Sequence, residues 1–320
     1  MPQNLVLNLV SRSVIPQKFL QGSAVQNLFF DLVDEVDPQL GHVLRQDDQN
    51  RAYGLSALQV DVHPLAYVSR ESPQNLRLLS AEREVGTALQ FFHDHAIAPE
   101  TSFWWRITFL DDELFDHLTF LWTQLISEPF QLGTGTVSIT RVAADMPSVS
   151  TSSANWLGMA WASSCSYRDL YEAASPYEQT IHIQFLTPTA FEAEGYISPM
   201  PTVEAVFHPL RRFWNRYSGL VFAPSLIRGI VPLSFDIKTE EVCIRDSQGR
   251  LETVAGCMGK VSFRVLNGDP LITKRINALS DFSSYCSVGL GTLVGMGAMR
   301  RLSAAGVKHH DTIHSTTSQP

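Results

Sequence analysis

The sequence predicts an α+β protein in which one order of elements, β-α-β-β-α-β, occurs twice. Two observations support this fold class: apolar residues form short strand-like runs, and other stretches have the three-and-four apolar spacing of amphipathic helices. A stretch rich in Ser, Pro and Thr at 145–155 separates the two copies, which share no obvious sequence repetition. The composition, 44% hydrophobic and 18% charged over 320 residues, is that of a globular protein.

The first copy begins with a strand and a helix of clear pattern. Val25, Leu28, Phe29, Leu32 and Val33 give the helix its apolar stripe, Asp37-Pro38 ends it, and a loop with Gly41-His42 follows. Asp111-Asp112 is a plausible cap for the second helix. The elements are a strand at 5–10, a helix at 22–36, strands at 53–60 and 103–110, a helix at 111–125 and a strand at 133–142. Residues 64–99 read as an insertion with a helix at 83–93.

The second copy follows the linker-like stretch in the same order. A turn at Ser247-Gln248-Gly249 predicts a hairpin between its two longest strands. Its elements are a short helix at 167–174, a strand at 180–186, a helix at 209–217, strands at 230–245 and 251–265, a helix at 271–282 and a last strand. We therefore expect two ferredoxin-like domains, at 1–145 and 155–305, and a polar tail at 306–320.

The most distinctive stretch is a glycine-rich segment before the last strand, with Gly289, Gly291, Gly295 and Gly297. Glycine allows positive φ and close approach of a ligand, so such a loop can cradle phosphates. Arg300 and Arg301 follow and can add guanidinium contacts. The alternative is a small-residue turn that packs tightly against a neighbour. The spacing does not match the dinucleotide or nucleoside-triphosphate loops, which disfavours a nucleotide-dependent enzyme.

Charge and cysteine content narrow the function classes. The formal net charge of −8 argues against a general nucleic-acid binder, but residues 257–320 hold seven Lys and Arg against three Asp. A local basic face fits binding of one specific polyanion, and equally ordinary surface variation. Four cysteines without C-x-x-C spacing suit a reducing compartment, so we expect a cytoplasmic protein. The uncharged stretch 282–299 holds four glycines and three serines between Asp281 and Arg300, so we expect no membrane span.

Several motifs follow one another along the chain: the stretches Leu186–Phe191, Val206–Asn215 and Ala255–Gly259, and the G-x-G-x-x-x-G-x-G segment. Together they resemble the CRISPR-associated repeat-RNA endoribonucleases, the Cas6 family. The resemblance covers most of the chain. It implies tandem ferredoxin-like domains and metal-independent cleavage of CRISPR repeat RNA without a cofactor. The neighbouring 2′-hydroxyl would attack and leave a 2′,3′-cyclic phosphate and a 5′-hydroxyl.

The resemblance also indicates catalytic candidates. His42 stands where the family has its catalytic histidine, although Gly41 replaces the leucine that often precedes it. Histidine suits proton transfer because its pKa lies near the working pH. The family's lysine is missing, so Arg45 and, by position, Arg51 are candidates for phosphate stabilisation, and Tyr53 for the absent helix tyrosine. The alternatives are a solvated histidine, surface arginines and a packed strand tyrosine. His93-Asp94-His95 does not place both histidines on one helical face, so we expect no metal site.

The RNA-binding candidates are the four glycines together with basic residues of the second half. These are Arg300, Arg301, Arg211, Arg212, Lys260, Lys274 and Arg275. We expect readout of RNA shape, phosphates and 2′-hydroxyls. The expected partners are CRISPR repeat RNA and other subunits of a CRISPR effector complex. Because the catalytic set is incomplete, a repeat-RNA-binding subunit that does not cut stays open as the alternative.

Overall fold

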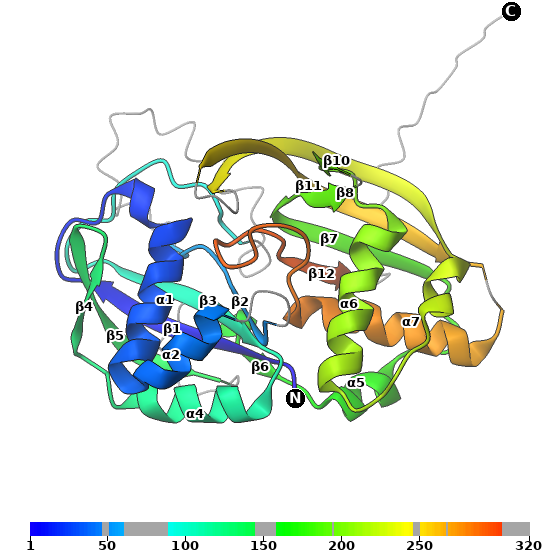
Figure 1. Ribbon diagram of the computed structural model, residues 1–320, viewed down its shortest axis with the longest axis horizontal. Helices are drawn as coiled ribbons and strands as arrows, with labels where there is room; N and C mark the ends of the chain where they lie inside the picture. The colour runs from blue at the N-terminus through cyan, green and yellow to red at the C-terminus, as the bar shows by residue number, and fades with distance from the viewer. Residues whose placement is uncertain are drawn as a thin grey trace, which may run out of the picture.

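The computed structural model describes residues 1–46, 51–60, 89–144, 158–193, 195–245, 250–266 and 268–302. The described chain forms two halves, each an antiparallel sheet with helices packed on one face (Figure 1). In both halves the strands of the β-α-β-β-α-β unit lie in the order second, third, first, fourth. This is the tandem ferredoxin-like α+β fold expected from the sequence.

The first half is built around strand β1 (Gln3–Ser11), which lies in the middle of the sheet order β2-β3-β1-β5-β4. The other strands are β2 (Tyr53–Leu55), β3 (Ser102–Phe109), β4 (Pro129–Leu132) and β5 (Gly135–Ala143). Helices α1 (Ser23–Val36) and α4 (Asp112–Thr123) cover one face. Alternate residues of β3, such as Phe103 and Trp105, share the buried core with the apolar stripe of α1.

The second half has the sheet order β10-β11-β7-β12. Its strands are β7 (Thr180–Thr189), β10 (Ile230–Arg245), β11 (Leu251–Val265) and β12 (Met299–Leu302). The helices are α5 (Tyr167–Ala173), α6 (Val203–Tyr217) and α7 (Pro270–Phe282). A small hairpin of β8 (Phe191–Ala193) and β9 (Tyr196–Ser198) precedes α6.

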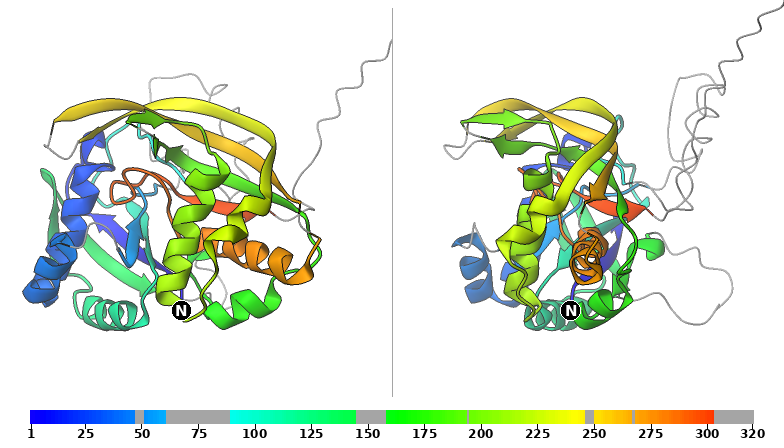
Figure 2. Two further views of the ribbon diagram at one scale, coloured as in Figure 1. Left: turned by 45° about the vertical axis from the view of Figure 1, so that its right-hand side comes forward. Right: turned by 90° about the vertical axis from the view of Figure 1, so that its right-hand side faces the viewer.

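The long β10–β11 hairpin arches over the glycine-rich segment toward the first half (Figures 1 and 2). Val242 and Val254 near its tip belong to a buried cluster with Ala57 and Phe91 of the first half and Met296 of the glycine-rich segment. The backbone N–H of Leu55 donates to the Thr292 carbonyl at 3.2 Å, and Ser56 forms a parallel bridge with Gly295. The glycine-rich segment therefore lies between the two halves and contacts both.

Some expected elements differ in the structure. Residues 38–46 form helix α2 (Pro38–Gln46) instead of a loop, because Pro38 can occupy the first turn of a helix and Asp37 Oδ1 accepts from the Leu40 N–H at 2.9 Å. Helix α6 begins at Val203, six residues before Pro209, because Thr202 Oγ1 caps it by accepting from Ala205 N–H. Residues 89–93 contain no helix, and 83–88 lie outside the described residues.

The domain limits stay a prediction, since the linker-like stretch and the polar tail lie outside the described residues. One strand bears on the limits: β6 (Ser163–Ser164), which falls within 155–305, pairs with β1 of the first sheet. None of the helices in the described ranges is long and apolar enough to cross a membrane.

Candidate active site

A cavity of about 810 Å³ opens between the two halves. The first half contributes Arg51, the start of β2 and the end of β3, and the second half contributes the β8–β9 hairpin, one face of α6 and the start of the glycine-rich segment. Its volume lies in the range of roughly 300–1,000 Å³ that is typical of ligand pockets. Polar and charged residues of the wall include Arg51, Tyr53, Glu192, Glu204, His208 and Arg212.

Two of the four catalytic candidates line this cavity. Arg51 lies two residues before β2, and Tyr53, the first residue of β2, pairs with Phe109 in the sheet. The Tyr53 ring stacks on Phe29 of α1 with 4.5 Å between centroids, and the residue is only 5% exposed. Tyr53 therefore packs against the core while forming part of the cavity wall, and its packing fixes the strand that follows Arg51.

His42 lies on α2 and is exposed, outside the residues that line the cavity. Its Nε2 is 2.8 Å from the Nε2 of Gln46, one helical turn later. Packing between the helices explains why position 41 is a glycine, because a Cβ there would overlap the carboxylate of Asp34 on α1. A leucine at this position would push apart the two helices that hold His42.

Arg45 holds α2 against α1. Its Nη1 and Nη2 donate to Asp34 Oδ1 and Oδ2 at 2.8 and 2.5 Å, and its guanidinium lies 4.4 Å from the centroid of the Phe30 ring. The hydrogen bonds from Arg45 lower the pKa of Asp34. The guanidinium considered for phosphate stabilisation is thus already engaged with a carboxylate, and these contacts fit a role in positioning His42.

The four glycines all have positive φ, between +67° and +94°. A Cβ on Gly295 would lie 2.7 Å from the backbone nitrogen of Ala57, and one on Gly289 would lie 2.3 Å from the Ala190 carbonyl oxygen. Gly291 and Gly297 face Met296 and Val288 in the same way. The glycines thus allow close packing within the segment and across the halves. Gly289 also lines the cavity, and contact with RNA stays a prediction for all four.

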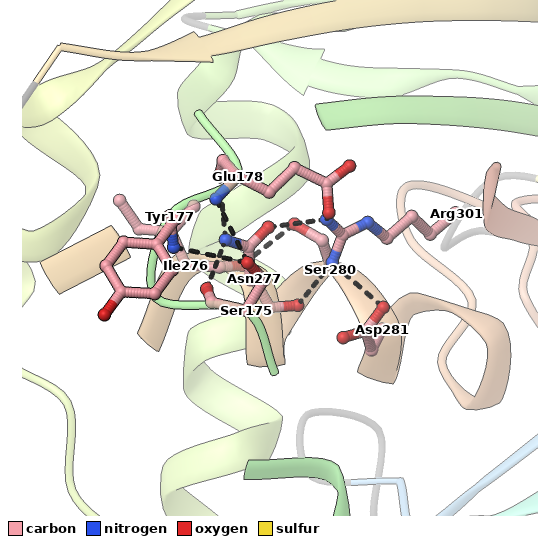
Figure 3. Close-up of polar contacts among 8 residues, drawn as sticks. All are labelled: Ser175, Tyr177, Glu178, Ile276, Asn277, Ser280, Asp281 and Arg301. Atoms are coloured by element: carbon pink, nitrogen blue, oxygen red, sulfur yellow. Dashed lines mark hydrogen bonds and ion pairs between the residues drawn. The ribbon is translucent and has the colours of Figure 1, made fainter. Parts of the chain in front are cut away.

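Arg301 occupies a closed network of polar contacts at the base of β12 (Figure 3). Its Nη2 contacts Glu178 Oε2 at 2.6 Å, and its Nη1 contacts Asp281 Oδ1 at 3.0 Å. The Asn277 side chain also accepts from Arg301, at 2.6 Å, and donates to the Ser175 and Glu178 carbonyls. Only 10% of the Arg301 side chain is exposed. The contacts of Arg301 tie β12 to α7 and to the turn before β7, and they use the guanidinium that we expected to bind RNA.

Arg300 points to the other face of the sheet, as alternation along a strand requires. Its Nε and Nη2 donate to Gln184 Oε1 at 3.1 and 2.9 Å. Gln184 on β7 is also the register partner of Lys260 on β11, so Lys260, Gln184 and Arg300 form a row across the sheet. This row lies on the face opposite the helices.

The other basic candidates are spread over the second half. Arg211 donates to the Phe222 carbonyl at 3.0 Å, Arg275 lies over the Phe222 ring, and Lys274 donates to the Glu172 carbonyl at 3.1 Å. Arg212 alone among the basic RNA-binding candidates lines the cavity. The structure therefore brings Arg212 together with Arg51 and Gly289, and places the remaining basic candidates elsewhere.

Sequence reasoning missed His208, which lines the cavity from α6. The signal was present: Glu204, His208 and Arg212 are spaced four apart, which places them on one helical face. This shared face is not recognised when the helix is predicted to begin at Pro209, because Glu204 and His208 then lie outside the helix. With the helix starting at Val203, the face carrying these three residues continues one turn further and forms the wall of the cavity.

Comparisons with known proteins agree on one family. The profile described as "CRISPR Cas6 N-terminal domain" matches residues 1–172, and "CRISPR-associated endoribonuclease Cas6" matches 183–299. Two solved Cas6 product complexes are similar in structure. One is 20% identical (TM-score 0.66; 94% of this chain and 100% of that chain covered), the other 18% identical (TM-score 0.63; 95% and 100%). Thermus thermophilus Cas6 is 19% identical (TM-score 0.60; 94% and 98%). At these identities the likeness shows a common fold. A search among curated protein sequences found no match.

Proposed function

Because the chain belongs to the CRISPR-associated Cas6 endoribonuclease family, we propose that it cuts CRISPR precursor RNA within the repeats to produce guide RNAs. The cut is metal-independent. The 2′-hydroxyl next to the scissile phosphate attacks phosphorus, and the products are a 2′,3′-cyclic phosphate and a 5′-hydroxyl. Other subunits of a CRISPR effector complex are the further partners we propose.

The observation that carries this proposal is the cavity between the two halves. It brings Arg51 of the first half into one cavity with Arg212 and Gly289 of the second, so two arginines from different halves line one space of about 810 Å³. Arginine matches phosphate oxygens with a planar fork of donors and stays charged at all working pH values. Arg51 is the group we assign to stabilising negative charge on the phosphate in the transition state.

The reaction also needs proton transfer. A base takes the proton from the 2′-hydroxyl as its oxygen bonds to phosphorus, and an acid supplies a proton to the departing 5′-oxygen. We assign His42 to the proton transfer at the 2′-hydroxyl. The ion pair of Arg45 with Asp34 holds the helix that carries it, and its imidazole is exposed on α2.

The test uses repeat RNA labelled at its 5′ end, incubated with the protein in EDTA. We expect cleavage at one position in the repeat, with a 2′,3′-cyclic phosphate on the upstream fragment. An otherwise identical RNA with a single 2′-deoxynucleotide just upstream of that position should stay intact. Cleavage of the deoxy substrate contradicts the 2′-hydroxyl mechanism. Saturated binding without any cleavage supports the alternative, a repeat-RNA-binding subunit that does not cut.

A further inference from the structure

We propose that His208 is a second catalytic histidine, which protonates the leaving 5′-oxygen from the second half of the molecule. This inference rests on the proposed endoribonuclease function and deepens it. It makes the active site a composite: proton transfer and charge stabilisation by His42 and Arg51 come from the first half, and the proton for the leaving group comes from α6.

The position of His208 is the first support. It lines the cavity that Arg51 and Tyr53 also line, although these residues belong to the other half. Helix α6 and strand β2 lie in different halves, with the glycine-rich segment between them (Figure 1). A phosphate bound in this cavity would therefore lie between groups of two separate domains.

The availability of the His208 ring is the second support. The ring is exposed, and it makes no hydrogen bond or ion pair with the part of the chain that the structure describes. The other histidines of the described ranges all have an intramolecular contact: His42, His93, His95, His117 and His182. Among these histidines His208 combines a place in the cavity wall with an imidazole that no described residue engages.

The chemistry requires a group in such a place. In phosphoryl transfer the attacking and leaving oxygens lie roughly in line on opposite sides of phosphorus. The bond from the 2′-oxygen to phosphorus forms as the bond from phosphorus to the 5′-oxygen breaks. The proton from the 2′-hydroxyl goes to one side, and the proton for the 5′-oxygen comes from the other. One side chain cannot serve both positions at once, so a second group across the phosphate is needed.

The surroundings of His208 contain charges of both signs. On its own helix Glu204 lies one turn before it and Arg212 one turn after it. The other titratable groups of the cavity wall are Arg51 and Tyr53 from the first half, Glu192 and Tyr196 from the β8–β9 hairpin, and Tyr285 and Cys286 before the glycine-rich segment. The two arginines favour binding of the phosphate whose leaving 5′-oxygen accepts the proton from His208.

A substrate with sulfur in place of the leaving 5′-oxygen tests the assignment, because a thiolate departs without a proton. Single-turnover rates are measured for wild type, H42A, H208A and H208Q on the oxygen and sulfur substrates. We expect both His208 variants to cut the oxygen substrate about 10²–10⁴-fold more slowly than wild type. They should cut the sulfur substrate at close to the wild-type rate, with unchanged RNA affinity, whereas H42A should stay slow on both.

His182 provides the matched control, because it lies on β7 of the same half and contacts Ser262 outside the cavity. H182A should cut the oxygen substrate at the wild-type rate. The inference is overturned if the His208 variants match wild type on the oxygen substrate, if they are equally slow on both substrates, or if sulfur rescues H42A instead. If the wild-type protein cuts neither substrate, the proposed function itself fails, and that result is distinct from the other three.

Discussion

Replacing Arg301 with methionine separates a role in the fold from a role in RNA binding. The guanidinium is 10% exposed and contacts the carboxylates of Glu178 and Asp281 together with the Asn277 side chain (Figure 3). Methionine keeps much of the length and apolar surface of the side chain but removes every donor. The variant therefore leaves two carboxylates close together without their shared cation.

The expected loss of stability follows from the burial of this network. Removing one partner of a buried ion pair costs about 3–5 kcal/mol, because the remaining charge is left uncompensated. The Glu178 and Asp281 side chains are 35% and 34% exposed, so solvent screens them and lowers the figure to about 2–3 kcal/mol. For a domain of roughly 150 residues, this corresponds to a decrease in melting temperature of about 4–12 °C.

The loss should also depend on pH. Burial raises the pKa of Asp281, and the neighbouring Glu178 raises it further, whereas Arg301 lowers it. In R301M only the raising causes remain. A carboxyl group with a higher pKa in the folded state adds stability below its unfolded pKa and loses that contribution as the pH rises through the folded pKa. The stability difference between wild type and R301M should therefore be largest at neutral pH and shrink toward acidic pH.

The assay is thermal and urea unfolding of both proteins at several pH values, with RNA affinity measured well below the melting temperature. R301M combined with D281N should recover part of the lost stability at neutral pH. R300M is the matched control on the neighbouring position: Arg300 donates to the neutral Gln184 side chain and lies over the Trp161 ring, so its replacement should change the unfolding free energy by less than about 1 kcal/mol. If R301M unfolds like wild type but loses RNA affinity, Arg301 binds RNA and the structural account is wrong.

Three further predictions concern the glycine-rich segment and helix α2. Gly295→Val should lower the melting temperature and weaken cleavage, because its Cβ would meet the first half at positive φ. Gly268→Val is the control, since a Cβ there meets open space. Equal melting temperatures for both variants would contradict the inference that Gly295 packs closely against the first half. His42→Ala should slow cleavage about 10²–10⁴-fold at unchanged RNA affinity, and an unchanged rate would remove His42 from the mechanism. Arg45→Met should slow cleavage less than His42→Ala does and increase proteolysis of α2, because the ion pair to Asp34 is lost. If Arg45→Met slows cleavage as much as His42→Ala without affecting α2, Arg45 acts on the phosphate itself.

The fold could be predicted from the sequence where local signals agreed. Strands β10 and β11 have the bounds that alternation and the Ser-Gln-Gly turn indicate, and the apolar stripe of α1 is buried as its spacing requires. Two prolines account for the wrong predictions of where helices begin. Pro38 starts α2 as well as ending α1, and Pro209 lies inside α6 instead of at its start. In both cases one proline is compatible with two local structures, and the capping partner decides between them.

The candidate site was predictable only in part, for a physical reason. The family motif indicated Arg51 and Tyr53, and both line the cavity. No local pattern could show that α6 supplies the opposite wall, because that wall depends on how the two halves pack together. His208 was missed for this reason as well as for the proline, since the four-residue spacing of Glu204, His208 and Arg212 shows a shared helical face but not what that face lines.

The packing between the halves also links the fold to catalysis. The Leu55 N–H bonds to the Thr292 carbonyl, and Ser56 pairs with Gly295, so the glycine-rich segment fixes β2 relative to the second half. Arg51 stands two residues before β2, and His208 stands on α6, so their separation is set by contacts that neither residue makes. A small shift of reacting groups can lower rates about 100-fold. Substitutions in the glycine-rich segment should therefore reduce the rate of cleavage more than they reduce RNA affinity, even though the glycines supply no proton and no charge.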